Sequence, residues 1–155
     1  MPDIENVSLL RLREFLPYRL SVLSNTISTR IASLYDREFG LSIWQWRVMA
    51  VTGDRPGISA TEIGQLTAMD KVAVSRAIAA MIQMGYLERK TSETDGRRSQ
   101  LFLTPAGRDV YELIVPMALG AEQKLASSLT EEEQKQLERL MGKLADAASP
   151  DRPLW

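Results

Sequence analysis

The segment from Ser59 to Gly107 contains, in this order, the start signal of a short helix, a turn, a second helix and two short strands joined by a polar loop. Ser59 and Glu62 have the spacing of a capping box, in which a hydroxyl and a carboxylate satisfy free backbone amides at a helix start. Asp70 precedes the second helical pattern, and Gly85 follows it. This order predicts a helical unit with one small β-hairpin at its end.

Apolar side chains define the buried face of the second helix, residues 71–84. They recur at three- and four-residue spacing, which places them on one side of a helix. We expect this side to pack on Ile63 and Leu66 of the preceding helix. The inward residues are Val74, Ala77, Ile78 and Met81, and the outward ones are Lys71, Val72, Ser75, Arg76 and Ala79. Residues 86–90 and 100–103 read as the two strands, with Asp95-Gly96 in the loop between them.

Helical patterns also flank this unit. An apolar stripe after Pro17 predicts one long helix that ends near Phe39, with Gly40 as its stop, and another helix opens at Ser42. A further helix is expected from 105 to about 127. Within it, Pro116 predicts a kink or a local break, because its ring displaces a carbonyl one turn back.

The C-terminal part ends in a second capping box. Thr130 and Glu133 have the required spacing, and acidic residues suit the positive end of the helix dipole. A narrow apolar seam follows. Its members are Leu137, Leu140, Met141 and Leu144.

The composition excludes several functional classes. The 155 residues include no cysteine and no histidine, which removes disulfides, thiol nucleophiles, histidine bases and the usual zinc ligands. No paired-carboxylate or phosphate-loop pattern occurs, so we expect no enzyme, cofactor or metal site. No apolar run approaches the roughly 18 residues of a membrane span, and the N-terminus does not resemble a signal peptide. These features favour a cytoplasmic protein without membrane contact.

Charge is distributed unevenly along the chain. The net charge is −1, but six basic residues and three acidic ones lie between Lys71 and Arg98, and the acidic excess lies beyond residue 109. Attraction to phosphates depends more on such a local basic patch than on the net charge of the whole chain.

The outward face of the second helix predicts a contact with nucleic acid. Its side chains are small or singly charged, so the helix backbone could approach base edges. Arg76 could donate to guanine or phosphate and Ser75 to either, whereas Val72 or Ala73 could touch a thymine methyl. The alternative reading of this face alone is a solvated helix surface.

The hairpin tip carries Arg97 and Arg98, whose long side chains could reach phosphates or a minor groove. Taken alone, the tip is an ordinary polar turn. The ordered combination of two helices and a basic hairpin favours DNA binding instead. The residues that we expect to face DNA are Ser59, Thr61, Lys71, Val72, Ser75, Arg76, Arg97 and Arg98.

Four short blocks carry a resemblance to a known family. They are Val74-Ser75-Arg76, Gly85-Tyr86-Leu87-Glu88-Arg89, Asp95-Gly96-Arg97-Arg98 and Leu103-Thr104-Pro105-Ala106-Gly107. With their spacing, the blocks resemble the multiple-antibiotic-resistance regulator (MarR) family of winged helix-turn-helix repressors. The fold class implied is mainly α with a small β-hairpin wing and dimerising N- and C-terminal helices.

The resemblance implies a homodimer that straddles pseudo-palindromic double-stranded DNA. Arg97 would enter the minor groove, and Asp95 would orient the neighbouring arginines. Gln100 departs from the family, in which many members have another arginine. One MarR-like domain would span residues 1–155, with DNA bound by 42–105 and dimerisation through 17–40 and 106–148.

The apolar stripes of the terminal helices exceed what one winged unit needs to cover its core, which favours burial between subunits. Packing of these helices on each other within one chain is the alternative.

The resemblance also suggests a small aromatic or carboxylated effector that relieves repression. Candidate contacts are Arg30, Tyr35, Trp44 and Arg47. The alternative is that these aromatic residues only fill the core. A different function class stays open: a winged-helix module that binds a protein partner without DNA.

Overall fold

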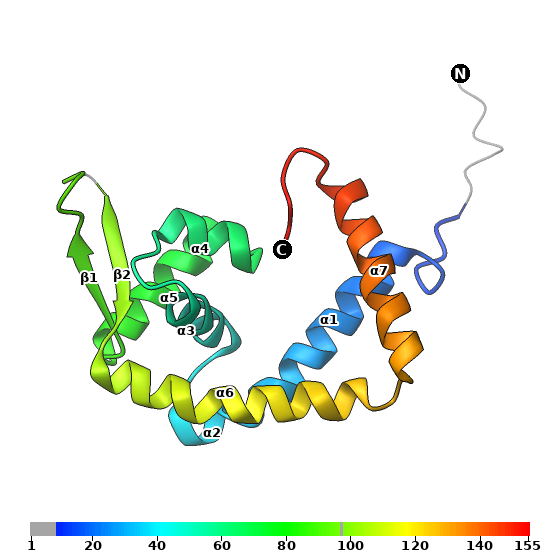
Figure 1. The fold of residues 1–155 in the computed structure, drawn as a ribbon, viewed down its shortest axis with the longest axis horizontal. Coiled ribbons are helices and arrows are strands. Elements are labelled where there is room, and N and C mark those ends of the chain that lie inside the picture. Colours follow the sequence, from blue (N-terminus) through cyan, green and yellow to red (C-terminus); the bar gives the residue numbers. More distant parts are fainter. Residues whose placement is uncertain (1–8, 97) are drawn as a thin grey trace.

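The computed structural model describes residues 9–96 and 98–155. Figure 1 shows two regions joined by α6, which runs from the hairpin to the turn before α7. One region contains α3, α4, α5 and the hairpin, and the other contains α1 and α7. The elements are α1 (Leu16–Ala32), α2 (Asp36–Phe39), α3 (Ile43–Asp54), α4 (Ala60–Thr67), α5 (Lys71–Gln83), β1 (Leu87–Thr91), β2 (Ser99–Leu103), α6 (Pro105–Ala126) and α7 (Glu131–Ala148).

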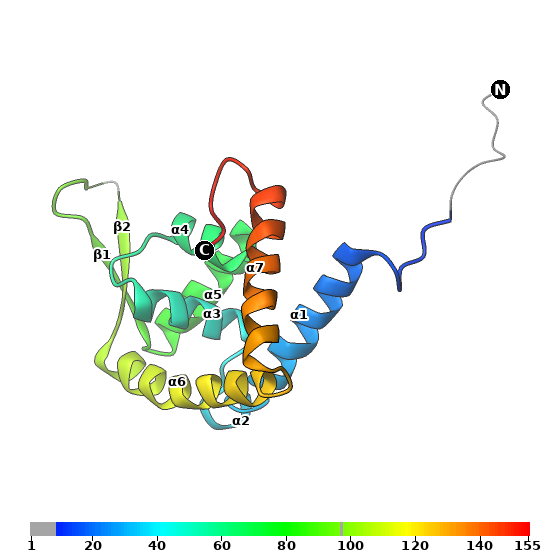
Figure 2. The same ribbon diagram turned by 45° about the vertical axis from the view of Figure 1, so that its right-hand side comes forward.

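The winged unit, which we define as α3 to β2, contains most of the hydrophobic core. Val48 and Met49 of α3 meet Ile78 of α5, and each of these side chains is at most 1% exposed. Leu101 of β2 and Ile114 of α6 join the same cluster and are equally buried. The start of α6 is therefore fixed to the winged unit, whereas its far end extends towards α1 and α7 (Figure 2).

The turn between α4 and α5 follows the sequence signals closely. Ser59 and Glu62 form the predicted capping box of α4, and the Asp70 carboxylate accepts a hydrogen bond from Ala73 N at 2.8 Å. Ala68 ends α4 in the left-handed region with φ of 53°. Gly85 has φ of 77° directly after α5, as expected of a glycine that ends a helix.

The hairpin is antiparallel and pairs Leu87 with Leu103 and Thr91 with Ser99. An isolated bridge joins Ile58 to Leu101, so the segment before α4 extends the sheet edge. The Thr104 hydroxyl accepts a hydrogen bond from Gly107 N at 3.0 Å and donates one to Gly85 O at 2.6 Å. This one side chain therefore caps α6 and fixes it to the end of α5.

The prediction of one helix through to Phe39 was wrong. The chain turns at residues 33–35, and α2 follows as a separate short helix. Leu34 N and Tyr35 N donate to carbonyls three residues back, and the Ser33 hydroxyl donates to Arg30 O at 2.7 Å. The turn places Tyr35 in the core with 1% exposure, which a continuous helix does not require.

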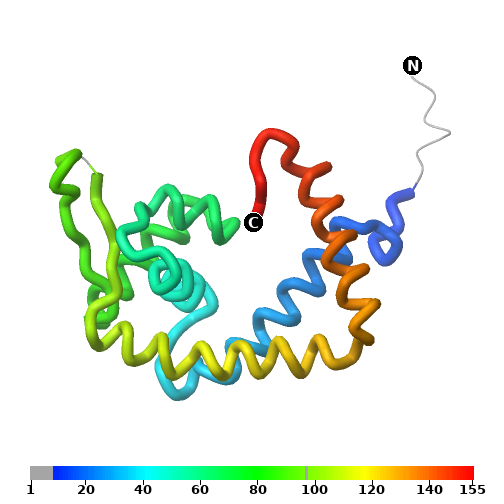
Figure 3. The backbone as a smooth tube through the Cα atoms, in the orientation of Figure 1, coloured from blue at the N-terminus to red at the C-terminus, as the bar shows by residue number. Residues whose placement is uncertain are grey.

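Two other expectations differ from the structure. Of the kink or local break predicted at Pro116, the break does not occur, because α6 runs without interruption from Pro105 to Ala126. Figure 3 shows α6 as one continuous coil. Leu66 was expected to face inward beside Ile63, yet it is 39% exposed whereas Ile63 is fully buried. The inward face of α5 agrees with the prediction, since its four apolar residues are all buried.

Among the described helices, none combines the length and the apolar character needed to cross a lipid bilayer.

Candidate nucleic-acid interface

The outward face of α5 is exposed along its whole length in the winged unit. Lys71, Val72, Ser75, Arg76 and Ala79 all lie at the surface, opposite the buried side chains. The Asp70 side chain caps the start of this helix by accepting a hydrogen bond from Ala73 N, and Lys71 and Val72 of the first turn are exposed. A surface of this kind, with two cations and small neighbours, can enter a DNA major groove.

The start of α4 lies next to the wing, which we define as residues 87–103. The Glu62 carboxylate accepts hydrogen bonds from the Ser59 hydroxyl at 2.7 Å and from Ser59 N at 2.9 Å. These bonds lower the pKa of Glu62, and the positive charges of Arg98 and Arg55 lower it further. Arg98 is therefore close enough to the start of α4 to act on it electrostatically.

The same geometry constrains Ser59 and Thr61. The Ser59 hydroxyl also accepts from Glu62 N at 3.2 Å, so it is already engaged inside its own cap. Thr61 is exposed on the first turn of α4. Both residues were predicted to contact DNA. The Ser59 hydroxyl serves as the cap of α4, whereas the Thr61 side chain is exposed and has no part in that cap.

The wing is held by polar contacts across and along its strands. Arg89 donates to the Ser99 hydroxyl at 3.0 Å, and Lys90 pairs with Glu88 at 2.9 Å. The Arg98 Nε lies 4.0 Å from an Asp95 carboxylate oxygen, and both side chains are largely exposed. Arg97 lies outside the described residues, so the prediction for it stays a prediction.

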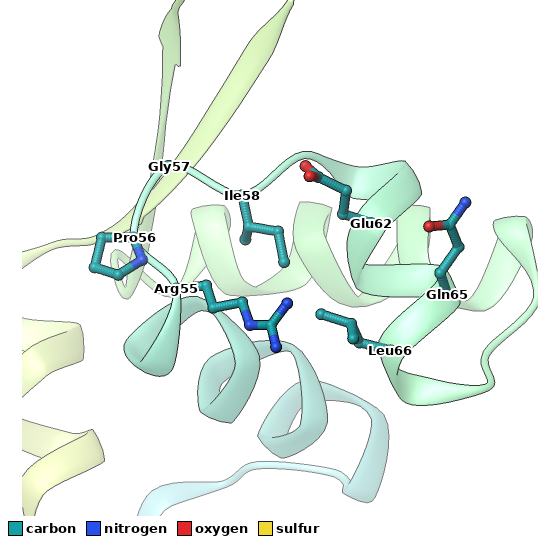
Figure 4. A pocket seen from close by; sticks show the side chains of 7 residues that line it. All are labelled: Arg55, Pro56, Gly57, Ile58, Glu62, Gln65 and Leu66. Carbon is teal, nitrogen blue, oxygen red and sulfur yellow. The ribbon is translucent and has the colours of Figure 1, made fainter. Parts of the chain in front are cut away.

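A surface pocket of about 370 Å³ lies between the end of α3 and α4 (Figure 4). The Arg55 side chain extends between Ile58 and Leu66, and Glu62 lies on the far side of Ile58. Arg55 also forms an exposed ion pair with Asp54 at 3.5 Å. Leu66, which the sequence pattern wrongly predicted to be buried, thus forms one wall of this pocket.

The four candidate effector residues do not all meet. Arg47 lies over the Trp44 ring, 5.3 Å from its centroid, and donates to the Ser28 hydroxyl at 3.3 Å. Arg30 is exposed in the last turn of α1. Trp44 and Arg47 therefore form an aromatic and cationic pair where α1 meets α3.

Tyr35 is placed differently, because it is a core residue. Its ring lies 5.6 Å from that of Trp46, which in turn stacks on Tyr111 at 6.2 Å. Burial raises the pKa of Tyr35 to about 12, although the charge of Arg47 opposes the increase. The Tyr35 hydroxyl is therefore neutral at physiological pH and offers almost no surface to a ligand in this structure. The row of three aromatic rings that it starts was not predicted, since no sequence spacing links the turn before α2 with α3 and α6.

Apolar side chains remain exposed on the helices outside the winged unit. The apolar side chains along α7 are each nearly half exposed to solvent; Leu140, for example, is 48% exposed. A groove of about 690 Å³ lies between α1, the end of α6 and α7, and its apolar walls include Leu23, Leu125 and Leu137. Packing within one chain therefore does not cover these helices.

The fold and the exposed α5 face define a winged helix-turn-helix protein of the DNA-binding type. The sequence profile described as the MarR family matches residues 39–98. The HTH-type transcriptional regulator BilQ of Clostridium symbiosum (strain WAL-14163) is 32% identical over 105 residues, which is 68% of this chain and 73% of BilQ. MgrA of Staphylococcus aureus is 28% identical over 138 residues, covering 88% and 91% of the two chains. The chain belongs to the MarR family of transcriptional regulators, and the expectation that it is not an enzyme is confirmed.

Solved structures agree on the fold. A MarR/EmrR family regulator from Acinetobacter sp. ADP1 matches with a TM-score of 0.83 and 25% identity over 91% of this chain and 99% of that one. A Listeria monocytogenes MarR family regulator complexed with 26mer DNA matches with a TM-score of 0.79 and 19% identity, over 89% and 91%. PcaV from Streptomyces coelicolor, in complex with its natural ligand, matches with a TM-score of 0.74 and 20% identity, over 92% and 99%.

Proposed function

We propose that this chain acts in the cytoplasm as a homodimeric repressor that binds a pseudo-palindromic DNA site through two copies of the winged unit. The observation that carries the proposal is the exposed outward face of α5, with Lys71 and Arg76 beside small residues. Arg98 lies on the adjacent wing, and its charge acts on the start of α4. The start of α4, the helix α5 and the wing contact DNA in winged helix-turn-helix proteins, and each carries exposed basic or polar side chains in this chain.

The exposed apolar helices support the homodimer. Leu137, Leu140 and Met141 form a continuous apolar strip on α7, and Leu23 faces the same groove from α1. Exposed strips of this length favour association in water, because burying them removes apolar surface from solvent. A twofold dimer would hold two α5 helices about one DNA turn, roughly 34 Å, apart.

The proposed effector is a small aromatic or carboxylated molecule bound near Trp44 and Arg47, with Arg30 on the neighbouring helix α1. Tyr35, which is buried, could contact it only after a change in the packing of this region. A carboxylate could pair with a guanidinium while an aromatic ring stacks on the indole. The relative PcaV was solved with its natural ligand, which supports looking for a ligand here. The effector would relieve repression only if it binds the DNA-free geometry more tightly.

The DNA-binding part is tested by gel shift against duplexes selected from random DNA at low salt. We expect the wild type to bind duplexes of one particular sequence. Arg76→Ala and Arg98→Ala should each weaken this binding by roughly 1–3 kcal/mol. Arg152→Ala changes an exposed arginine after α7, outside the winged unit and the dimerising helices, and this matched control should bind as the wild type does. If no DNA is retained at any salt concentration, the chain is instead a protein-binding module.

Dimer formation and effector binding need separate measurements. Sedimentation should give a dimer for the wild type and a monomer for Leu140→Glu, and a monomeric wild type would contradict the proposal. Quenching of tryptophan fluorescence by benzoate or 4-hydroxybenzoate tests the effector site. A response that is unchanged in Arg47→Ala and Trp44→Phe would place any ligand elsewhere.

A further inference from the structure

The outermost side chain of α5 is apolar. At about 100° per residue, Val72 lies about 180° from the mean direction of the buried face formed by Val74, Ala77, Ile78 and Met81. It is 59% exposed and belongs to the first turn, which begins at Lys71. Recognition helices present their N-terminal residues to base edges. Val72 is therefore the α5 side chain that points most directly away from the core, in the turn that a recognition helix presents to base edges.

The fold itself gives no reason for a valine at this position. Among the described residues, Val72 belongs neither to the core nor to the apolar side chains packed against it. A β-branched residue also lowers helix propensity relative to alanine at an exposed site. The Asp70 cap acts on Ala73 N and involves only the backbone of the first turn.

The chemistry of base edges limits what Val72 can recognise. A valine side chain has no hydrogen-bond donor or acceptor, so it cannot read the polar groups of a base. The apolar group that an unmodified base pair presents in the major groove is the C5 methyl of thymine. Ser75 and Arg76 lie one turn further along, on either side of Val72, and can supply the polar contacts around it. Ala79 continues the same face and is small enough to allow close approach.

We propose that Val72 recognises one thymine in each DNA half-site through its C5 methyl group. The inference rests on the proposed function and specifies its DNA sequence preference at one position. The methyl contact distinguishes thymine from the other three bases in that place, without any hydrogen bond from Val72.

The test uses DNA in which single methyl groups are removed. Starting from the duplex selected by the wild type, each thymine is replaced in turn by deoxyuridine, which keeps every hydrogen-bonding group of the base. We expect replacement of one thymine per half-site to weaken wild-type binding about fourfold, the effect of one buried methyl group. The Val72→Ala variant should bind the thymine duplex and the deoxyuridine duplex with the same affinity.

A matched control separates the contact from general effects. Leu154 is an exposed apolar residue after α7, outside the winged unit and the dimerising helices, and Leu154→Ala should keep the fourfold difference between thymine and deoxyuridine. A second experiment needs no protein variant. When the contacted thymine is replaced by cytosine, the duplex with 5-methylcytosine there should bind the wild type about fourfold more tightly than the duplex with unmethylated cytosine. Circular dichroism checks that Val72→Ala keeps its helix content.

The inference is overturned if selected DNA binds the wild type yet no deoxyuridine replacement weakens it. It is equally overturned if the loss persists in Val72→Ala. In both of these cases the proposed DNA-binding function stands. If no duplex is bound at all, the proposed function fails, and the inference fails with it.

Discussion

Replacing Gly107 by alanine tests how α6 is joined to the winged unit. Gly107 is buried in the first turn of α6, and a Cβ there would overlap the Tyr86 carbonyl oxygen and lie 2.8 Å from the carbonyl carbon. That carbonyl is fixed, since it accepts a hydrogen bond from Thr104 N at 3.1 Å. Thr104 in turn is held by Gly85 O and Gly107 N. The clash is with backbone and cannot be relieved by rotation of a side chain.

The expected cost follows from this contact. Forcing an extra carbon into a packed site usually costs about 1–3 kcal/mol. Alanine gains about 1 kcal/mol over glycine in a helix, but strain at a fixed backbone contact exceeds ordinary overpacking, so we expect a net loss of about 1–3 kcal/mol. For a chain of this size, that lowers Tm by about 3–9 °C.

Gly64→Ala is the matched control in the same unit. Its Cβ would lie 3.5 Å from Met69 O and 3.6 Å from Val74 Cγ2, which are ordinary contacts, so this variant should gain up to about 1 kcal/mol. Urea unfolding followed by circular dichroism at one fixed protein concentration measures both variants. If Gly107→Ala is as stable as the wild type, the junction is looser than described and the reasoning is refuted.

Three further perturbations have defined outcomes. Ser59→Ala removes the capping box of α4 and should lower the free energy of unfolding by about 1 kcal/mol in the same urea assay; an unchanged midpoint would contradict the cap. Because the pKa of Glu62 in the folded chain is below its ordinary value of 4.5, its ionised form stabilises the fold above that pH. This contribution is lost as the pH falls through the lowered pKa, so the stability difference between wild type and Glu62→Gln should shrink in acid, and a constant difference would exclude the effect. Lys71→Ala should reduce the slope of log affinity against log salt by about 1 in gel-shift titrations, whereas an unchanged slope would remove Lys71 from the phosphate contacts.

Local signals in the sequence predicted much of this fold. Capping boxes at Ser59 and Thr130 began helices where expected, and the buried face of α5 followed from spacing alone. These features depend on neighbours within four residues, so a single sequence contains the information. The outward face of α5 could be proposed as the DNA-binding surface for the same reason.

Features that depend on distant contacts could not be predicted. The turn at residues 33–35 places the Tyr35 ring beside Trp46 of α3, and no local pattern in the sequence encodes that contact. Apolar residues continue at helical spacing across residues 33–35, so the sequence pattern predicted one unbroken helix there. Pro116 suggested a kink or a local break, yet the helix continues through the proline, which lies on its exposed side. The pocket at Arg55 likewise depends on how α3 and α4 meet.

The length of α6 has a mechanical consequence. Its 22 residues span about 33 Å. Ile114 and Thr104 fix its first half beside the hairpin, and at its far end Ala126 O accepts a hydrogen bond from Gln134 of α7 at 3.0 Å. A tilt of about 5° at the end next to α7 moves the hairpin end through an arc of about 3 Å, which approaches the 3.4 Å rise between base pairs. In the proposed homodimer, small rotations between the two subunits would therefore shift the winged units by close to one base-pair step.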